Sequence, residues 1–270
     1  MKKALLISVA IDGHSHEVGK LYKILHEKYG YRMEDIFVYC EGAGCSREPT
    51  YTNIMKILQD FASLSSSCDE LWIYYSGHGI ENGLVMSDQK LITKQLIHRI
   101  LYKIKCPCFI LLDCCHSGQF ASLLEWNYTF DGGQTHVHPW TITNPNIYML
   151  CSCSSTELSA NLYHSIDNIH IGAFTMAFCA ILDAASYSID LDELFENVCF
   201  YMKTFRGLEN QKPIMGSSGN EIRWNFLPCS QPEDNNKKIQ SNFLGLVGKE
   251  DGCSKIRKIK RATTRVSFLI

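Results

Sequence analysis

The sequence predicts an α/β protein built on a mostly parallel central sheet of about six strands, with helices on both faces. Two observations predict this fold. Short, continuously apolar segments alternate with longer amphipathic segments, and strands that are covered by helices on both faces have this unbroken apolar character. In addition, 46% of the 270 residues are hydrophobic and 20% are charged, which permits a sizeable core and excludes a disordered chain.

The first third of the chain is predicted to hold three strands and two helices. Residues 17–29 place Val18, Leu21 and Leu25 on one helical face, and Gly30 can end that helix. The next helix begins after Pro49-Thr50 and carries Ile54 and Phe61 on its apolar face. Apolar runs predict the three strands, at residues 3–10, 35–40 and 70–75.

The rest of the predicted domain continues the same alternation to residue 228. Apolar periodicity predicts helices and short apolar runs predict strands, and the segment 222–226 is a candidate for a final strand. The helices are expected at 93–104, 172–183 and 191–205, and the strands at 108–112, 147–151 and 222–226.

Two segments fall outside this pattern. Residues 119–146 contain several Gly and Pro residues and are expected to form an irregular insert in the domain 1–228. Residues 229–270 are expected to be a flexible, partly basic C-terminal tail, with the cluster KIRKIKR at 255–261. A solvated tail is the simplest interpretation of that cluster, and a localisation signal or a contact with an anionic partner are alternatives.

Charge and cysteine content restrict the partners and the compartment. The net charge is −2 and no apolar run approaches the roughly 18 residues of a membrane span, so neither nucleic acid nor a membrane is an expected partner. The 13 cysteines cannot all pair, and several lie in apolar runs, which favours a reduced cytoplasmic or nuclear protein. The apolar stretch at 4–10 imitates a signal peptide but is short, and a first buried strand explains it better.

Chemically reactive residues follow two successive strands. The third strand leads into Ser-Gly-His78-Gly79, and the fourth leads into Asp113-Cys-Cys115-His-Ser-Gly. Ligands of parallel sheets bind beyond the carboxyl ends of the strands, so a thiol and an imidazole meeting there suit nucleophilic catalysis. His78 would protonate the leaving group, and the amides of Gly79 and Cys115 would form an oxyanion hole. Taken alone, each motif is equally explained by a turn or by buried packing.

Four motifs together resemble the metacaspase branch of the caspase-like cysteine peptidases. They are YYSGHG at 74–79, FILLDCCHSG at 109–118, GAFTMAF at 172–178 and QKPIM at 211–215. The resemblance covers residues 3–226 and implies a caspase-hemoglobinase fold and hydrolysis of peptide bonds. It implies that His78 is the catalytic histidine and Cys115 the nucleophile, with Cys114 in the variable, packing position.

Three acidic residues are candidates for substrate binding. Asp113 lies two residues before the nucleophile, and Glu17 begins the first helix at the same edge; two carboxylates there favour a basic side chain. The resemblance assigns Asp113 to the family's pocket and aligns Glu17 with a second family acid that is normally Asp. A helix-start acid that complements the dipole is the alternative for Glu17. Glu157 is either a third acidic contact or a surface residue.

The expected protein is therefore an active cysteine endopeptidase that cuts after Arg or Lys. An Asp-specific caspase-like protease and a catalytically silent scaffold with the same fold are the alternatives. Many metacaspases need calcium, but here only Asp88 is a plausible ligand after His78, and Ser122 stands where an acid is expected, so no cofactor is predicted. The pairs Cys106/Cys108, Cys151/Cys153 and His136/His138 lack zinc-knuckle spacing.

Self-processing of the insert is not expected. No Lys or Arg occurs between Lys105 and Lys203, so an enzyme with an acidic pocket has no site at 119–146. The protein is therefore expected to act as an uncut monomer on protein or peptide substrates that contain basic residues. The Asp-specific alternative predicts a cut after Asp131.

Overall fold

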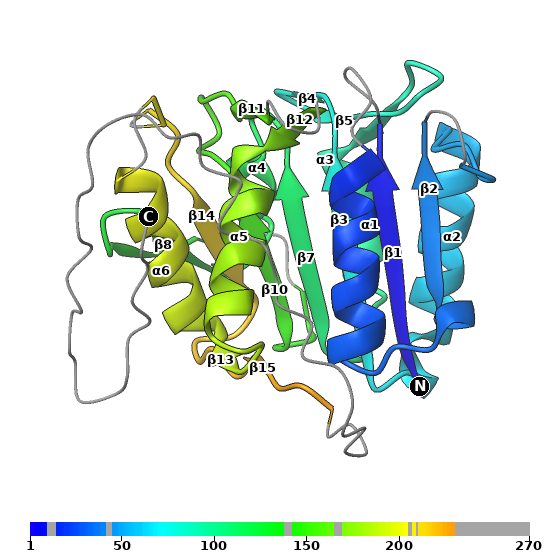
Figure 1. The fold of residues 1–270 in the computed structure, drawn as a ribbon. Helices are drawn as coiled ribbons and strands as arrows, with labels where there is room; N and C mark the ends of the chain where they lie inside the picture. Colours follow the sequence, from blue (N-terminus) through cyan, green and yellow to red (C-terminus); the bar gives the residue numbers. More distant parts are fainter. Residues whose placement is uncertain are drawn as a thin grey trace, which may run out of the picture.

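A central sheet of eight strands organises the part of the chain that the computed structural model describes, namely residues 1–9, 15–41, 45–137, 142–164, 169–204, 207–208 and 210–229. The strand order is β2-β1-β3-β7-β10-β14-β8-β9 (Figure 1). Pairing is parallel from β2 to β10 and antiparallel from β10 to β9, which confirms the predicted mostly parallel α/β fold. The strands are β1 (Lys2–Ser8), β2 (Ile36–Cys40), β3 (Glu70–Ser76), β7 (Cys108–Asp113), β8 (Trp126–Thr129), β9 (Gln134–His136), β10 (Ile147–Cys151) and β14 (Ile214–Ser217).

Helices cover both faces of this sheet, and each face buries its own core. Consecutive strand residues alternate between the two cores: Leu6 and Tyr74 belong to one, and Ile7 and Tyr75 to the other. This double burial explains why the strands are apolar without interruption. The first core contains side chains of α1 (Ser15–Lys23) with its continuation η1 (Ile24–Lys28), α5 (Ala173–Ala184) and α6 (Leu191–Thr204); the second contains side chains of α2 (Tyr51–Leu64), α3 (Lys94–Leu101) and α4 (Gly118–Ala121).

Smaller elements lie outside the central sheet. The most important for the site is a three-stranded sheet of β4 (Gly79–Ile80), β5 (Gly83–Val85) and β6 (Leu91–Thr93), which directly follows β3. The others are the pair β11 (Asn161–His164) and β12 (Ile169–Gly172), the pair β13 (Ile189–Asp190) and β15 (Asn225–Phe226), and the short 3₁₀ turns η2 (Met33–Asp35) and η3 (Ser65–Ser67).

Two sequence-based expectations were wrong. The sixth strand of the central sheet is β14 rather than residues 222–226, of which only β15 is extended, and β15 pairs with β13 outside the main sheet. The segment 119–146 was expected to be irregular, yet it supplies most of α4 and the hairpin β8–β9, which extends the sheet beyond β14. The predicted tail lies outside the described residues from 230 onward.

The cysteines depart in one place from the expected fully reduced chain. Cys40, at the end of β2, forms a disulfide with Cys45, and their Cα atoms are 5.7 Å apart. The ten other cysteines of the described ranges are free, and most of them are buried. Among the described residues, no helix has both the length and the apolar character needed to cross a membrane.

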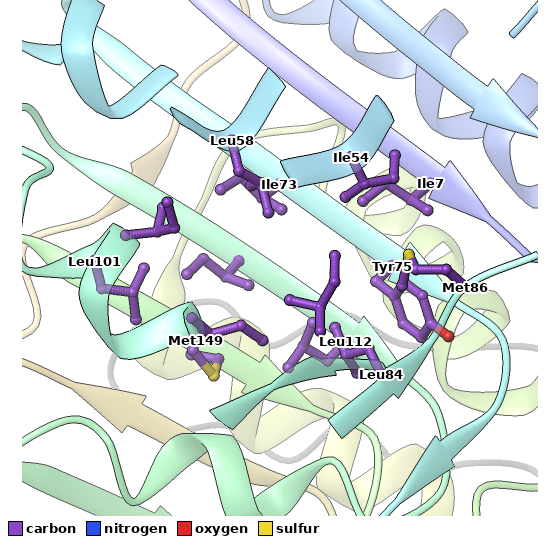
Figure 2. Close-up of a pocket in the computed structure, with 14 residues that line it drawn as sticks. Ile7, Ile54, Leu58, Ile73, Tyr75, Leu84, Met86, Leu101, Leu112 and Met149 are labelled. Atoms are coloured by element: carbon purple, nitrogen blue, oxygen red, sulfur yellow. The ribbon is translucent and has the colours of Figure 1, made fainter. Parts of the chain in front are cut away.

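A small cavity lies between the sheet and its α2/α3 cover. Its volume is about 40 Å³, and only apolar parts of side chains are exposed to it. Figure 2 shows Ile54 and Leu58 of α2 on one side, with Tyr75 and Leu112 near the ends of β3 and β7. An apolar cavity of this kind stays dry, so it is a true packing defect beneath the strands that lead to His78 and Cys115.

Candidate active site

His78 and Cys115 leave the sheet side by side. Strands β3 and β7 are parallel neighbours, and Ser76 is paired with Asp113 at their carboxyl ends. Each candidate catalytic residue lies two positions beyond this last pair, at the edge where parallel sheets bind ligands. His78 is exposed and Cys115 is half-buried, so a substrate can reach both.

Gly79 brings the two loops into direct contact. A Cβ atom built on Gly79 would lie 2.0 Å from the backbone oxygen of Cys115 and 2.9 Å from the sulfur of Cys114. No side chain fits in that space. The glycine after the histidine is therefore required because the backbones of the two loops touch there.

The backbone of the histidine loop is fixed by the residues around it. The hydroxyl of Tyr75, which is buried, lies 2.8 Å from the carbonyl oxygen of His78 and 2.7 Å from that of Val85. The amide of Val85 also donates to the His78 oxygen, at 3.0 Å. In the antiparallel pair β4–β5, Gly79 is opposite Leu84, and since bonded and non-bonded pairs alternate, the Gly79 N–H points away from its partner strand.

The turn after the nucleophile is held by the loop that follows β10. His116 has a left-handed backbone, with φ of 57°. Its amide donates to the oxygen of Glu157 and its Nδ1 contacts the oxygen of Ser155, both at 2.9 Å. These bonds hold a strained residue in place next to Cys115. The Cys115 amide itself has no hydrogen-bond partner among the described residues and, like that of Gly79, is available to an oxyanion.

Cys114 and Cys115 occupy different environments. The Cys114 side chain is 2% exposed, and burial raises the pKa of its thiol well above the usual value. A buried thiol with a raised pKa is a poor nucleophile. Cys115 is the more accessible of the two, in keeping with the sequence-based assignment of Cys114 to packing.

Asp113, two residues before Cys115, forms a buried pair of carboxyl groups with Glu17. They are 5% and 3% exposed. A Cβ atom built on Gly172 would lie 2.2 Å from Oδ2 of Asp113 and 3.2 Å from Oε1 of Glu17, so both groups converge on this glycine. Glu17 is in the first turn of α1. It is therefore both an acid at the start of a helix and a member of the carboxyl pair, so the two interpretations are compatible. Among the described residues, no Lys or Arg forms an ion pair with either group.

The hydrogen-bond donors around this pair are uncharged hydroxyl and amide groups. Asp113 accepts from the Ser159 hydroxyl at 2.6 Å, and from the amide and the hydroxyl of Thr175 at 2.9 and 2.7 Å. Glu17 accepts from the amide of Gly172 and from the Tyr74 hydroxyl, which is 2.7 Å away. The Tyr74 hydroxyl also lies 3.1 Å from that of Thr175, so one hydrogen-bond network contains both carboxyl groups.

Both carboxyl groups resist ionisation. Burial is the main cause of the raised pKa of Asp113, although its hydrogen bonds partly offset this. Burial also raises the pKa of Glu17, and the nearby negative charge of Asp113 raises it further. Buried carboxyl groups with raised pKa values and no counter-ion among the described residues, at the edge where parallel sheets bind ligands, make this pair a candidate functional site.

Glu157 does not join this pair. Its Oε2 accepts from the amides of Ser154 and Lys212, at 3.1 and 3.0 Å. Its backbone oxygen also supports His116, as described above. Glu157 is half-buried and connects the loop after β10 to the segment before β14.

The two candidate calcium residues are already engaged. Asp88 accepts from the Tyr51 amide at 3.0 Å and pairs with Lys90 at 3.1 Å. The Nζ atom of Lys94 donates to the hydroxyl of Ser122 at 2.6 Å, so an ammonium group lies beside the position where the resemblance implied an acid. In the described ranges, no group of three or more His, Cys, Asp or Glu side chains could hold a metal ion. Asp88 and Ser122 therefore do not fit a calcium site. His138, of the pair His136/His138 considered for zinc, lies outside the described residues.

Four residues of the carboxylate network were missed by the sequence analysis. Tyr74 and Thr175 lie within motifs that were noticed, but their hydroxyl groups gave no local signal of a role. Gln211 also lies in a noticed motif, and it meets Ser159, which no motif contains, from a loop far away in the sequence. Only the tertiary fold brings them to Asp113.

Comparisons with known proteins agree with this geometry. The family model of the caspase domain (Peptidase_C14) matches residues 1–223. The chain belongs to the caspase-domain family. This confirms the resemblance that the four motifs indicated.

Other members of the family show similar sequences. Metacaspase-4 of Arabidopsis thaliana is 34% identical over 140 residues, which cover 43% of this chain and 34% of that protein. Metacaspase-7 of the same plant is 28% identical over 96% of this chain and 64% of that protein. This caspase-domain chain therefore matches less than two thirds of the length of either relative. The crystal structure of caspase-1 from Spodoptera frugiperda has a TM-score of 0.51 and 16% identity, covers 82% of this chain and 88% of that one, and supports the fold.

Proposed function

We propose that this caspase-domain protein is a metacaspase-type cysteine endopeptidase that hydrolyses peptide bonds after Arg or Lys. The observation that carries the proposal is the buried carboxyl pair of Asp113 and Glu17, which has no cationic partner in the described structure and begins two residues from Cys115. A guanidinium or ammonium group of the substrate would supply the missing positive charge. A bidentate bond from Arg would suit two convergent carboxylates.

The reaction would proceed through a covalent acyl-enzyme. The thiolate of Cys115 would attack the carbonyl carbon, and the electron pair of the C=O bond would move onto oxygen, where the amides of Gly79 and Cys115 would hold the negative charge. Collapse of this intermediate would break the C–N bond while His78 donates a proton to the leaving amine. Water, deprotonated by His78, would then attack the thioester carbonyl, and cleavage of the C–S bond would release the acid product and regenerate the Cys115 thiolate with a protonated His78.

A peptide panel tests the proposal. Fluorogenic peptides that differ only in Arg, Lys or Asp before the cleaved bond are offered to the wild type, to Asp113→Ala and to Asp60→Ala. Asp60 is exposed on α2 and serves as the matched control. A buried charge without its partner costs roughly 3–5 kcal/mol, which lowers kcat/KM by about two to four orders of magnitude in Asp113→Ala. Cleavage after Asp alone would support the Asp-specific alternative, and cleavage of no peptide would support a silent scaffold.

The proposal extends to the absence of a calcium requirement. The ammonium group of Lys94 already binds Ser122, which directly follows α4, the short helix after Cys115. Gln119 of α4 donates to the oxygen of Ile80 at 2.6 Å, which also connects the cysteine loop with the histidine hairpin. Two internal bonds thus support the arrangement that a bound cation would otherwise stabilise.

We also propose that the chain acts uncut and as a monomer. The ten free and mostly buried cysteines of its described ranges suit a reducing compartment such as the cytoplasm, despite the Cys40–Cys45 disulfide. The hairpin β8–β9 is built into the sheet edge, and Lys203 of α6 lies 4.4 Å from the ring centre of Phe130 at its turn. Intact-mass and size-exclusion measurements on the wild type and Cys115→Ala test this. Cys115-dependent fragments that end within 119–146, or a stable dimer, would contradict it.

A further inference from the structure

Gln211 joins three segments behind the carboxyl pair. It precedes β14, is 3% exposed, and belongs to the QKPIM motif, for which no role has been assigned above. Its Oε1 accepts from the amide of Ala160 at 2.9 Å. Its Nε2 donates to the oxygen of Ser152 at 3.0 Å and to the hydroxyl of Ser159 at 3.2 Å. Both N–H groups and the carbonyl are used, so the amide can adopt only one orientation.

This orientation determines what Ser159 can do. A serine hydroxyl has one proton, and the Ser159 oxygen already faces an N–H group of Gln211. It therefore accepts from Gln211 and directs its own proton to Oδ1 of Asp113, which is 2.6 Å away. Bonds in such a chain polarise and strengthen one another.

We propose that Gln211 is a positioning residue for the substrate pocket, which acts through Ser159 to keep a hydroxyl donor on Asp113 and so preserves its carboxylate for a basic side chain. This inference depends on the proposed function, because the carboxylate matters most when a cation must bind. It gives the fourth sequence motif a role in specificity.

The surroundings of Asp113 make the donor from Ser159 important. The titratable groups that interact electrostatically with Asp113 are Glu17 of α1, Tyr74 of β3, Cys179 of α5 and the adjacent Cys114. None of them is a cation. Burial raises the pKa of Asp113, and the bond from Ser159 is the largest of the hydrogen-bond contributions that lower it again.

Two substitutions test the relay in the whole chain. Gln211→Glu replaces the donor to Ser159 by an acceptor of the same shape, and Ser159→Ala removes the hydroxyl while leaving Gln211 its other bonds. Both should move the acidic limb of the kcat/KM profile for an Arg peptide to higher pH. A hydrogen bond to a charged group is involved, so below that limb kcat/KM should fall by about tenfold or more. Gln59→Glu, on the exposed face of α2, adds the same charge elsewhere and should leave the profile unchanged.

The double variant separates a relay from a general structural effect. If Gln211 acts through Ser159, Gln211→Glu should add little further shift in the Ser159→Ala background. An unshifted acidic limb in Ser159→Ala would overturn the inference. So would an equal shift from Gln211→Glu with and without the Ser159 hydroxyl. Should Gln211→Glu fail to fold, an unshifted acidic limb in Ser159→Ala would still overturn the inference.

A readout without substrate keeps this test distinct from that of the proposed function. If the wild type cleaves no basic peptide, the proposed function fails, and carboxyl ¹³C NMR of Asp-labelled protein takes the place of kinetics. The Asp113 signal is assigned by its loss in Asp113→Asn. Its titration should move to higher pH in Ser159→Ala, and an unchanged titration would overturn the relay.

Discussion

Gly79 and Cys115 touch through their backbones, and the point where a Cβ of residue 79 would lie is 2.0 Å from the carbonyl oxygen of Cys115. The relative placement of the two catalytic loops therefore depends on the absence of a side chain. The same contact brings the Gly79 amide to the side of the nucleophile. In the proposed reaction, position 79 thus combines steric fit with binding of the oxyanion.

We expect Gly79→Ala to inactivate the enzyme. The added methyl group must push the histidine hairpin away from Cys115, and loss of one oxyanion donor alone costs about 10²–10³ in kcat. Gly19→Ala is the matched control, because a Cβ there meets nothing within 4 Å and Ala favours the helix. Kinetics and thermal unfolding of both variants provide the measurement. Full activity in a folded Gly79→Ala protein would contradict the contact.

We expect Cys115→Ala to abolish peptidase activity and Cys114→Ala largely to spare it. Cys115 is accessible, whereas Cys114 is buried with a raised pKa. Labelling with an iodoacetamide probe, read by peptide mass mapping, should modify Cys115 first. Equal loss of activity in both folded variants would leave the nucleophile unassigned, and an active Cys115→Ala protein would refute the assignment.

The carboxyl pair should make stability depend on pH. The pKa values of Asp113 and Glu17 are raised above their ordinary values of 3.8 and 4.5, so the folded state binds more protons than the unfolded chain. The contribution of the pair to the free energy of unfolding is therefore complete at low pH and is lost as the pH rises through the raised values.

Asp113→Asn should flatten this dependence, since it removes one charge and lowers the repulsion on Glu17. Thermal melts between about pH 5 and about pH 8 should show a smaller decline in Tm than in the wild type. Asp60→Asn, at an exposed site, should follow the wild type. Parallel curves for wild type and Asp113→Asn would mean that the pair does not titrate in this range.

Peptidase activity should depend on the ammonium group of Lys94 and not on added calcium. Activity in a chelator should equal activity with added calcium, because the residues at Asp88 and Ser122 do not form a metal site. Lys94→Met removes the ammonium bond to Ser122 and keeps the apolar stem, so kcat should fall about 3- to 10-fold, the range of a single hydrogen bond. Lys56→Met, exposed on α2, is the control. A steep activation of the wild type by calcium would disprove the proposal.

The sequence predicted the elements that have strong periodicity and missed those that depend on tertiary context. Residues 147–151 form a strand within the predicted bounds, and Thr50 caps α2 through a bond from the Asn53 amide. Strand β14 escaped notice because it is short and contains Gly216, whereas the segment 222–226, with apolar residues at alternate positions, drew the prediction. The turn at Asp131-Gly132-Gly133 between polar-aromatic segments was a usable hairpin signal.

The residues of the candidate site also divide into those that the sequence predicted and those that depend on tertiary context. His78, Cys115 and Asp113 could be named because each directly follows or ends a buried strand. Ser159 and Gln211 could not, because their role arises from a contact between two loops 52 positions apart. Local patterns carry no information about such contacts.

The cavity between the sheet and the α2/α3 layer has a mechanical consequence. Void volume is lost when a protein unfolds, so hydrostatic pressure favours states in which the roughly 40 Å³ of empty space is filled or collapsed. Tyr75 and Leu112 line this space, and the chain runs from them directly to His78 and Cys115 (Figure 2). Compression at this cavity would therefore act on the strand ends that carry His78 and Cys115, two residues that must stay in register.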